Sequence, residues 1–237
     1  MINSAFAYAI PESIESKHAA PLMCAGASTF EALQAAGAKP SDRVGVVGIG
    51  GLGHTAIQFA KAMGCGVTAI SSGWEKAADA FKLGADEYRC TDDIDLVLVS
   101  EKPRQSSDIW AELEHGNWTT TLPQPMSIDV LLITSNEVPN LEYFLPLLAR
   151  RATIVLMTIQ LDSISIPYMP FVLPGHRLIA STEASYQNHF EMLAFAAQNR
   201  ISPWVEEFAM DLEGVAQAFR RLESGGIRYR GVLVRKE

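Results

Sequence analysis

The chain contains little cysteine and no long apolar run. Its 237 residues include 3 cysteines, Cys24, Cys65 and Cys90. Three cysteines cannot all pair, and none has C-x-x-C spacing, so neither a disulfide framework nor a cysteine zinc cluster is expected. No apolar stretch approaches the ~20 residues that cross a bilayer, and the N-terminus lacks the basic start and apolar core of a signal peptide. These absences predict a cytoplasmic protein without a membrane partner.

Positive charge is also scarce. Lys and Arg number 19 against 27 Asp and Glu, which gives a formal net charge of −8. Without a basic stripe to neutralise phosphates, nucleic acid is not an expected partner. Hydrophobic residues make up 48% of the chain, which is typical of a soluble globular protein with a substantial core.

The apolar pattern predicts alternating strands and helices. A β-branched run from Arg43 ends in glycines and leads into a helical stretch, which predicts a β-α-β-α unit with parallel strands. Near-continuous apolar strands suit a sheet that is covered on both faces. We therefore predict an α/β, Rossmann-type, doubly wound parallel sheet. Further strands are expected at 128–134, 152–158 and 177–182, and helices at 141–150, 188–198 and 212–223.

Two regions interrupt this alternation. Residues 101–127 are polar, contain three prolines and show no sustained period, so a long excursion is predicted there. Its Trp110 and Trp118 are expected to pack, either on the protein's own helices or as a lid over a substrate. Residues 1–20 form no clear element and resemble a remnant tail, which leaves 21–237 as the predicted dinucleotide-binding domain.

The motif that carries chemistry is Gly48-Ile49-Gly50-Gly51-Leu52-Gly53, which satisfies G-x-G-x-x-G between a strand and a helix. In that context Gly48 permits the turn, Gly50 allows the backbone to approach a pyrophosphate, and Gly53 lets the helix pack closely on the strand. The amides of Gly51 and Leu52 at the helix start can donate to the phosphates. The alternative is a glycine-rich turn without a ligand.

The end of the next strand indicates which cofactor is preferred. Folds that bind NAD usually place a carboxylate there for the ribose 2′-hydroxyl, whereas this chain has Ser71 and Ser72, with Lys76 following. Hydroxyl donors and an ammonium group suit a 2′-phosphate, which favours NADP(H) over NAD(H). Glu75 weakens this inference, and the serines could instead cap the helix.

Several stretches together resemble the cofactor half of the zinc-type medium-chain dehydrogenases, and the nearest branch is similar to the NADP-dependent cinnamyl alcohol dehydrogenases. The resemblance implies that Arg228 lies near the pyrophosphate and Ser28 near the nicotinamide. It covers most of residues 17–93 and 128–234. The stretches are AAPLMCAG, VGIGGLGHTAIQFAKAMG, VTAISS, LGADE and RLESGGIRYRGVLV.

The zinc ligands of that family are not matched. The resemblance implies a β-rich catalytic domain that supplies a cysteine, a His-Glu pair and a four-cysteine loop, and none of these is found in this chain. Cys24 matches the third ligand of the catalytic zinc, and one thiolate cannot hold the metal. The 5 histidines show no spacing that would replace the missing ligands. No metal site is therefore expected.

Three functions follow from a cofactor half without zinc. The first is a metal-independent, NADPH-dependent oxidoreductase acting on a bulky apolar small molecule, with Tyr186, His189 or Tyr143 as candidate acids. The second is a non-redox enzyme, a cyclase or isomerase, that reuses the same cleft. The third is a non-catalytic relic that retains affinity for the cofactor.

A homodimer is also expected. The apolar segment Ser163–Leu173 contains prolines, which predicts an edge strand. In the resembling family this region pairs across a two-fold axis. The final strand, 229–234, is expected to lack its usual neighbours and to leave apolar surface that needs cover.

Overall fold

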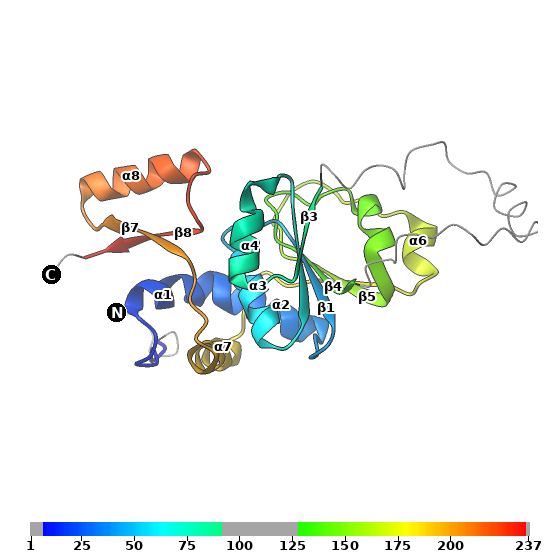
Figure 1. The fold of residues 1–237 in the computed structure, drawn as a ribbon, viewed down its shortest axis with the longest axis horizontal. Helices are drawn as coiled ribbons and strands as arrows, with labels where there is room; N and C mark the ends of the chain where they lie inside the picture. The colour runs from blue at the N-terminus through cyan, green and yellow to red at the C-terminus, as the bar shows by residue number, and fades with distance from the viewer. Residues whose placement is uncertain (1–6, 92–127, 236–237) are drawn as a thin grey trace, which may run out of the picture.

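The structure is a computed structural model that describes residues 7–91 and 128–235 (Figure 1). Its helices are α1 (Ser16–Pro21), α2 (Ala27–Ala36), α3 (Gly53–Ala62), α4 (Ala77–Leu83), α6 (Tyr168–Val172), α7 (Tyr186–Asn199) and α8 (Leu212–Glu223). Its strands are β1 (Arg43–Val47), β2 (Gly66–Ser71), β3 (Glu87–Cys90), β4 (Ile128–Ile133), β5 (Leu148–Leu156), β6 (Arg177–Ala180), β7 (Val205–Ala209) and β8 (Arg230–Val234).

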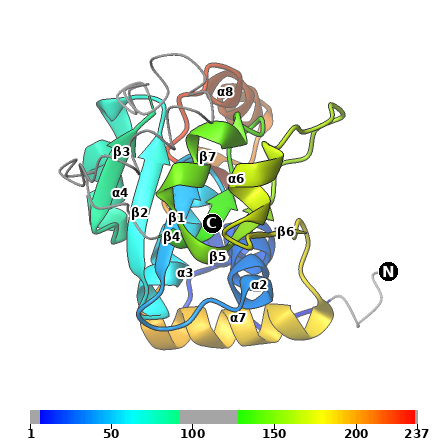
Figure 2. The same ribbon diagram turned by 90° about the vertical axis from the view of Figure 1, so that its right-hand side faces the viewer.

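Six of the strands form one parallel sheet in the order β3-β2-β1-β4-β5-β6. Figure 2 shows the strands running from β3 at one edge to β6 at the other. The strand order reverses between β1 and β4, so their carboxyl ends form the topological switch point at which doubly wound sheets bind ligands. The predicted α/β fold class is confirmed.

The sheet is buried because its strands are apolar on both faces. On one face, Val46, Leu132 and Val155 pack with apolar side chains of α2, α3, α4 and α7. On the other face, Leu131 and Ile133 pack with residues of the 141–147 segment. Burial on both faces accounts for the continuous Val, Ile and Leu runs that predicted a parallel sheet.

The last two strands leave this sheet. β7 and β8 pair with each other in a separate two-stranded parallel sheet, and α8 packs on both of them. Residues 205–234, here called the C-terminal lobe, lie at the end of the molecule opposite α6 (Figure 1). The final strand therefore has one neighbour, β7, within the described residues.

Two predicted secondary-structure elements are wrong, and prolines explain both differences. The helix predicted at 141–150 is replaced by two short 3-10 turns, and β5 begins at Leu148. Pro146 lacks an amide hydrogen and cannot continue an α-helix. The edge strand predicted at 163–173 is also wrong, because the part of the chain that the structure describes has no strand there and α6 begins after Pro167.

Two further predictions concern the N-terminal residues 1–20 and the excursion at 101–127. The region predicted to be without structure, 1–20, contains most of α1. Trp110 and Trp118 lie outside the described residues, as does the whole 101–127 excursion. Within the described ranges, no helix is both long and apolar enough to span a bilayer.

Candidate dinucleotide site

The glycine turn joins β1 to α3 at the switch point. Gly48 has φ +91°, and a Cβ at this position would lie 2.8 Å from the Ser135 backbone. A Cβ on Gly53 would lie 1.9 Å from the Gly48 carbonyl oxygen. A Cβ on Gly50, in contrast, would meet no atom within 4 Å. Gly48 and Gly53 therefore shape the turn, whereas Gly50 leaves open space that a pyrophosphate could approach.

Neighbouring side chains hold the turn in place. The Thr134 hydroxyl, at the end of β4, lies 2.7 Å from the Gly48 carbonyl oxygen and 2.9 Å from that of Val47, close enough to donate to either. His54, at the start of α3, is fully buried, and its Nδ1 lies 3.0 Å from the Gly50 carbonyl oxygen. Burial lowers the pKa of His54 to about 4, so the imidazole is neutral at pH 7 and donates from Nδ1.

Arg230, at the start of β8, lies against the same turn. Its Nε donates to the Gly51 carbonyl oxygen at 3.0 Å. The resemblance implies that Arg228 lies near the pyrophosphate, and that role remains a prediction. The structure places the Arg228 guanidinium beside α4, 3.8 Å from Asp79 Oδ2, and the Arg230 guanidinium at the glycine turn.

A cleft of about 670 Å³ opens above the glycine turn. This volume is within the usual range for cofactor and small-molecule sites. Polar groups from the ends of β4 and β5 line one side, and apolar side chains of α8 and β8 line the other. The lining residues are Gly50, Gly51, Leu52, Thr134, Ser135, Asn136, Met157, Thr158, Ile159, Ala218, Phe219, Leu222, Ile227, Tyr229, Arg230, Gly231 and Leu233.

The end of β2 carries the residues predicted to distinguish the two cofactors. Ser71 is buried and its side chain hydrogen-bonds that of Tyr88, whereas Ser72 is exposed. Lys76 precedes α4, and burial followed by the nearby charge of Arg228 lowers its pKa. Of the two serine hydroxyls, that of Ser72 is therefore the one available to a ligand.

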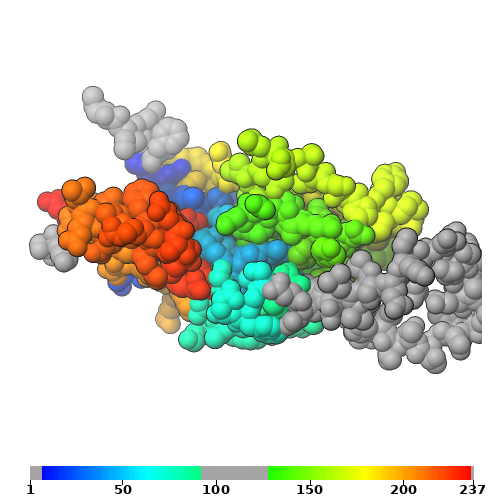
Figure 3. Space-filling model, turned by 90° about the horizontal axis from the view of Figure 1, so that it is seen from above, coloured from blue at the N-terminus to red at the C-terminus, as the bar shows by residue number. Residues whose placement is uncertain are grey.

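Arg228 lies beside α4, the helix that follows Lys76. Its Nε is 3.8 Å from Oδ2 of Asp79 on α4, and the same carboxylate oxygen accepts a 2.8 Å hydrogen bond from the Tyr229 hydroxyl. The space-filling view shows the C-terminal lobe next to α4 (Figure 3). These contacts join the lobe to the sheet domain.

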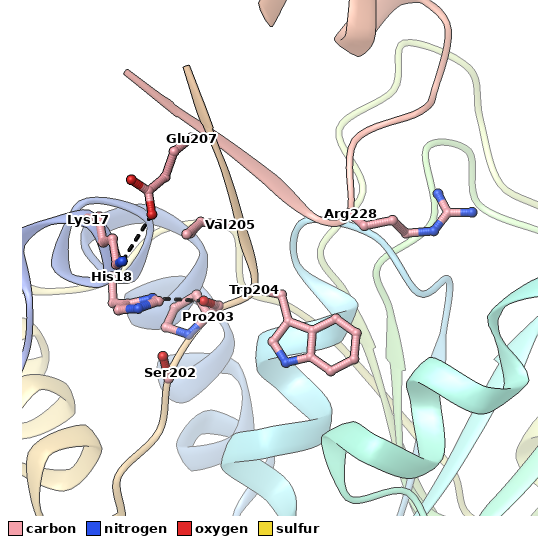
Figure 4. Close-up of a pocket in the computed structure, with 8 residues that line it drawn as sticks. All are labelled: Lys17, His18, Ser202, Pro203, Trp204, Val205, Glu207 and Arg228. Carbon is pink, nitrogen blue, oxygen red and sulfur yellow. Dashed lines mark hydrogen bonds and ion pairs between the residues drawn. The ribbon is translucent and has the colours of Figure 1, made fainter. Parts of the chain in front are cut away.

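A second pocket, of about 410 Å³, lies between α1 and β7 (Figure 4). Lys17 is paired there with Glu207 at 2.9 Å, and His18 Nδ1 lies 3.0 Å from the Pro203 carbonyl oxygen. Arg228 borders this pocket but its side chain is directed away from Lys17 and His18 (Figure 4). Because its polar groups bond one another, this pocket is the weaker candidate.

The predicted acids are not brought to the cleft. Tyr186 and His189 lie on α7, where Tyr8 stacks on the His189 ring with centroids 4.9 Å apart. The two ring nitrogens of His189 lie 2.8 Å and 3.2 Å from the carbonyl oxygens of Ser185 and Met23. Tyr143 lies in a 3-10 turn beyond β4. None of the three lines the cleft.

The remaining predicted positions are Ser28 and Cys24. Ser28 is buried on α2, and Cys24 is exposed in the π-helical turn Leu22–Gly26 between α1 and α2. Among residues 7–91 and 128–235, no three His, Cys, Asp or Glu side chains gather closely enough to hold a metal ion. The donors around Cys24 in the described chain therefore do not fit the zinc site that the resemblance implies.

Sequence reasoning missed three contributors to the site. Thr134, Asp79 and Arg230 all lie far along the chain from the glycine motif. A signal was present for Thr134, because it follows a predicted strand at the carboxyl edge of the sheet. No signal in the sequence pointed to the Asp79 contact.

A glycine turn of this geometry, at the switch point of a doubly wound sheet, is typical of dinucleotide-binding α/β proteins. Residues 51–198 match the family model described as zinc-binding dehydrogenase. The chain belongs to that family of oxidoreductases.

The relatives agree with this assignment. The chain is 34% identical over 233 residues to 1,2-dihydrovomilenine reductase of Rauvolfia serpentina, covering 98% of this chain and 57% of the relative. It is 28% identical to NADP-dependent alcohol dehydrogenase 6 of Saccharomyces cerevisiae, covering 98% and 59%. A solved cinnamyl alcohol dehydrogenase of Sorghum bicolor superposes with TM-score 0.76 at 29% identity, covering 94% and 57%. The chain thus spans less than two thirds of the length of these proteins.

Proposed function

We propose that the chain binds NADP(H) in the cleft above the glycine turn and acts as an NADPH-dependent oxidoreductase that does not use zinc. The observation that carries the proposal is the open space at Gly50, which faces a cleft bordered by Arg230. The yeast relative, an NADP-dependent alcohol dehydrogenase, supports the choice of cofactor.

Different residues of the chain would bind the pyrophosphate and the 2′-phosphate of NADP(H). Amides at Gly50, Gly51 and Leu52, with the Arg230 guanidinium, suit the pyrophosphate. Ser72 and Lys76 suit the 2′-phosphate. When bound, the nicotinamide supplies a hydride donor or acceptor, and Thr134 and Thr158 line the part of the cleft nearest the ends of β4 and β5.

The proposed substrate is a bulky apolar small molecule. Phe219 and Leu222 of α8 are exposed, and both line the cleft together with Leu233 of β8. Apolar side chains that face a cleft lose contact with water when an apolar ligand covers them, which favours such a ligand. The proposed independence of zinc rests on Cys24, because this one matching thiolate cannot hold the metal. Elemental analysis of protein purified without added metal tests it.

The experiment compares two glycines. Gly50→Ala fills the space proposed for the pyrophosphate, whereas Gly66→Ala adds a methyl group that also meets no atom within 4 Å, but at the start of β2. Titration with NADPH should show strong loss of binding for Gly50→Ala and unchanged binding for Gly66→Ala. Equal binding by both variants would contradict the proposed site, and tighter binding of NADH than NADPH would contradict the cofactor.

A second candidate is the non-redox cyclase or isomerase. It is favoured by the lining of the cleft, in which the described chain supplies no Asp, Glu, His, Cys or Lys, so a reduction would lack an obvious proton donor. Burial raises the pKa of Tyr229, the remaining acidic hydroxyl. Turnover of a substrate without a change in NADPH absorbance would favour this candidate, and cofactor binding without any turnover would favour a relic.

We also propose that the chain assembles as a homodimer through the surface around α6. Tyr168, Met169 and Leu173 are exposed by 73%, 54% and 71%, which is an unusual concentration of apolar side chains for a monomer. Light scattering should give the mass of a dimer. Tyr168→Asp with Leu173→Asp should give a monomer, whereas Leu161→Asp, outside the helix, should not.

A further inference from the structure

We propose that His54 is a positioning residue for the dinucleotide, which holds the peptide group between Gly50 and Gly51 with its amide toward the cleft. The inference rests on the proposed function and extends it to a side chain that does not itself line the cleft. His54 would act from behind the glycine turn. It binds the carbonyl oxygen of this peptide group, and the pyrophosphate would bind the amide on the opposite side.

Two hydrogen bonds from one residue set the orientation of this peptide group. The Gly50 carbonyl oxygen accepts from the His54 backbone amide at 3.1 Å and from its ring Nδ1 at 3.0 Å. A carbonyl oxygen has two lone pairs and can accept both bonds. Because a trans peptide group points its carbonyl oxygen and its amide hydrogen in opposite directions, the Gly51 amide points away from His54. Gly51 itself lines the cleft.

The peptide group lies between two glycines, so its orientation is easily lost. Glycine adopts positive and negative φ with similar ease. No atom lies within 4 Å of a Cβ placed on Gly50, so close packing does not restrain that side of the turn. A rotated peptide group would present a carbonyl oxygen instead of the Gly51 amide to the pyrophosphate. The ring bond of His54 opposes this rotation and also polarises the amide that the phosphate would bind.

The imidazole ring is fixed in place, yet packing alone would not select it. His54 is fully buried and stacks on Tyr229 with ring centroids 5.2 Å apart, and the Tyr229 hydroxyl donates to Asp79. The Nε2 atom of His54 has no hydrogen-bond partner in the described chain. A leucine or a phenylalanine would fill a similar volume without burying an unpaired nitrogen, which is unfavourable. The Nδ1 bond to Gly50 accounts for a histidine at this position.

The test compares the affinities of the unchanged protein, His54→Leu and His54→Asn for NADPH and for NADH by calorimetry. Leucine has no donor, whereas the side-chain amide of asparagine can donate to the Gly50 carbonyl oxygen as Nδ1 does. Since both cofactors carry a pyrophosphate, His54→Leu should weaken both alike by about fivefold, which is the change in affinity for the ~1 kcal/mol of one hydrogen bond. His54→Asn should retain most of the affinity.

Thr55→Val is the matched control. Thr55 follows His54 on α3, and its hydroxyl donates to the Leu52 carbonyl oxygen at 2.7 Å. The amide of that peptide group belongs to Gly53, which is buried. Thr55→Val should therefore leave both affinities unchanged. Adenosine 2′-monophosphate, which has no pyrophosphate, should bind His54→Leu as well as it binds the unchanged protein, a result that a general loss of structure would not give.

The outcomes separate this inference from the proposed function. If NADPH binds the unchanged protein and His54→Leu equally well, the inference is wrong and the proposed cofactor site stands. The same holds if His54→Asn or Thr55→Val loses as much affinity as His54→Leu, or if adenosine 2′-monophosphate is weakened by the same factor. If neither cofactor binds the unchanged protein, the proposed function itself fails.

The tautomer of His54 gives a second, independent measurement. A carbonyl oxygen can only accept, so the neutral ring must carry its proton on Nδ1. Nitrogen NMR shifts of the His54 ring at pH 7 should show the Nδ1-protonated form with and without NADPH, and an Nε2-protonated ring would overturn the inference. Thermal melting followed by circular dichroism verifies that each variant is folded.

Discussion

Acid should destabilise this protein through one buried histidine, His54. The side chain is fully buried, donates from Nδ1 to the Gly50 carbonyl oxygen, and stacks on Tyr229 with ring centroids 5.2 Å apart. Its Nε2 has no hydrogen-bond partner in the described chain. A proton on that nitrogen would be buried without an acceptor, and the charge of Arg230 adds to the penalty. The folded protein therefore excludes the proton that the unfolded chain accepts.

The size of the effect follows from the pKa of His54, which is about 4 in the folded chain against an ordinary 6.5. Each tenfold difference in proton affinity corresponds to ~1.36 kcal/mol, so the difference between the two pKa values of His54 corresponds to about 3 kcal/mol of unfolding free energy. About 2 kcal/mol of this stability is lost when the pH falls from about 7 to about 4.5. Between the two pKa values the unfolded state binds more protons. The free energy of unfolding should therefore fall as the pH falls through 6.5 and should stop falling on this account below about 4.

Urea unfolding at both pH values, for the unchanged protein and for His54→Phe, tests this reasoning. Phenylalanine preserves the stacking on Tyr229 and cannot titrate, so the variant should lose about 2 kcal/mol less stability than the unchanged protein when acidified. Carboxylates such as Asp86 and Glu206, whose pKa values are lowered by ion pairs, contribute equally to both proteins and cancel. Equal loss of stability in His54→Phe and the unchanged protein would refute the assignment.

Three further outcomes are expected. Gly53→Ala should lower the free energy of unfolding by about 3 kcal/mol in urea titrations, because its Cβ would lie 1.9 Å from the Gly48 carbonyl oxygen; an unchanged midpoint would contradict the close packing. Thr134→Val keeps the shape but loses the bonds to the Val47 and Gly48 carbonyls, and should cost about 1 kcal/mol and weaken NADPH binding; retention of both properties would show that the hydroxyl does not hold the turn. Asp211→Ala removes the N-cap of α8, whose carboxylate accepts a hydrogen bond from the Gly214 amide at 2.8 Å. The substitution should lower the free energy of unfolding by about 1 kcal/mol and should make hydrogen exchange faster in α8 than in α3. Uniform exchange would mean that the cap does not control the helix.

Local chemistry determined the parts of the molecule that the sequence predicted well. The turn from Gly48 to Gly53 was recognisable because its backbone demands are met within six residues: positive φ at Gly48, and no room for a Cβ at Gly53. The strands β1, β2 and β4 were recognisable because burial on both faces requires continuous apolar runs. Proline made the weaker predictions fail. The 141–150 segment has helical periodicity, but Pro146 prevents an α-helix from continuing through it.

Tertiary structure alone decided which distant side chains meet at the site. Sequence reasoning named Arg228 alone, and Arg230 lies two positions further along the chain. Which one reaches the glycine turn depends on how β8 enters its pairing with β7, and that pairing brings Arg230 to Gly51 and Arg228 to Asp79. The apolar pattern of a segment indicates which of its faces are buried. It does not indicate which elements it packs against, because a strand's neighbours are set by contacts between residues far apart in the chain.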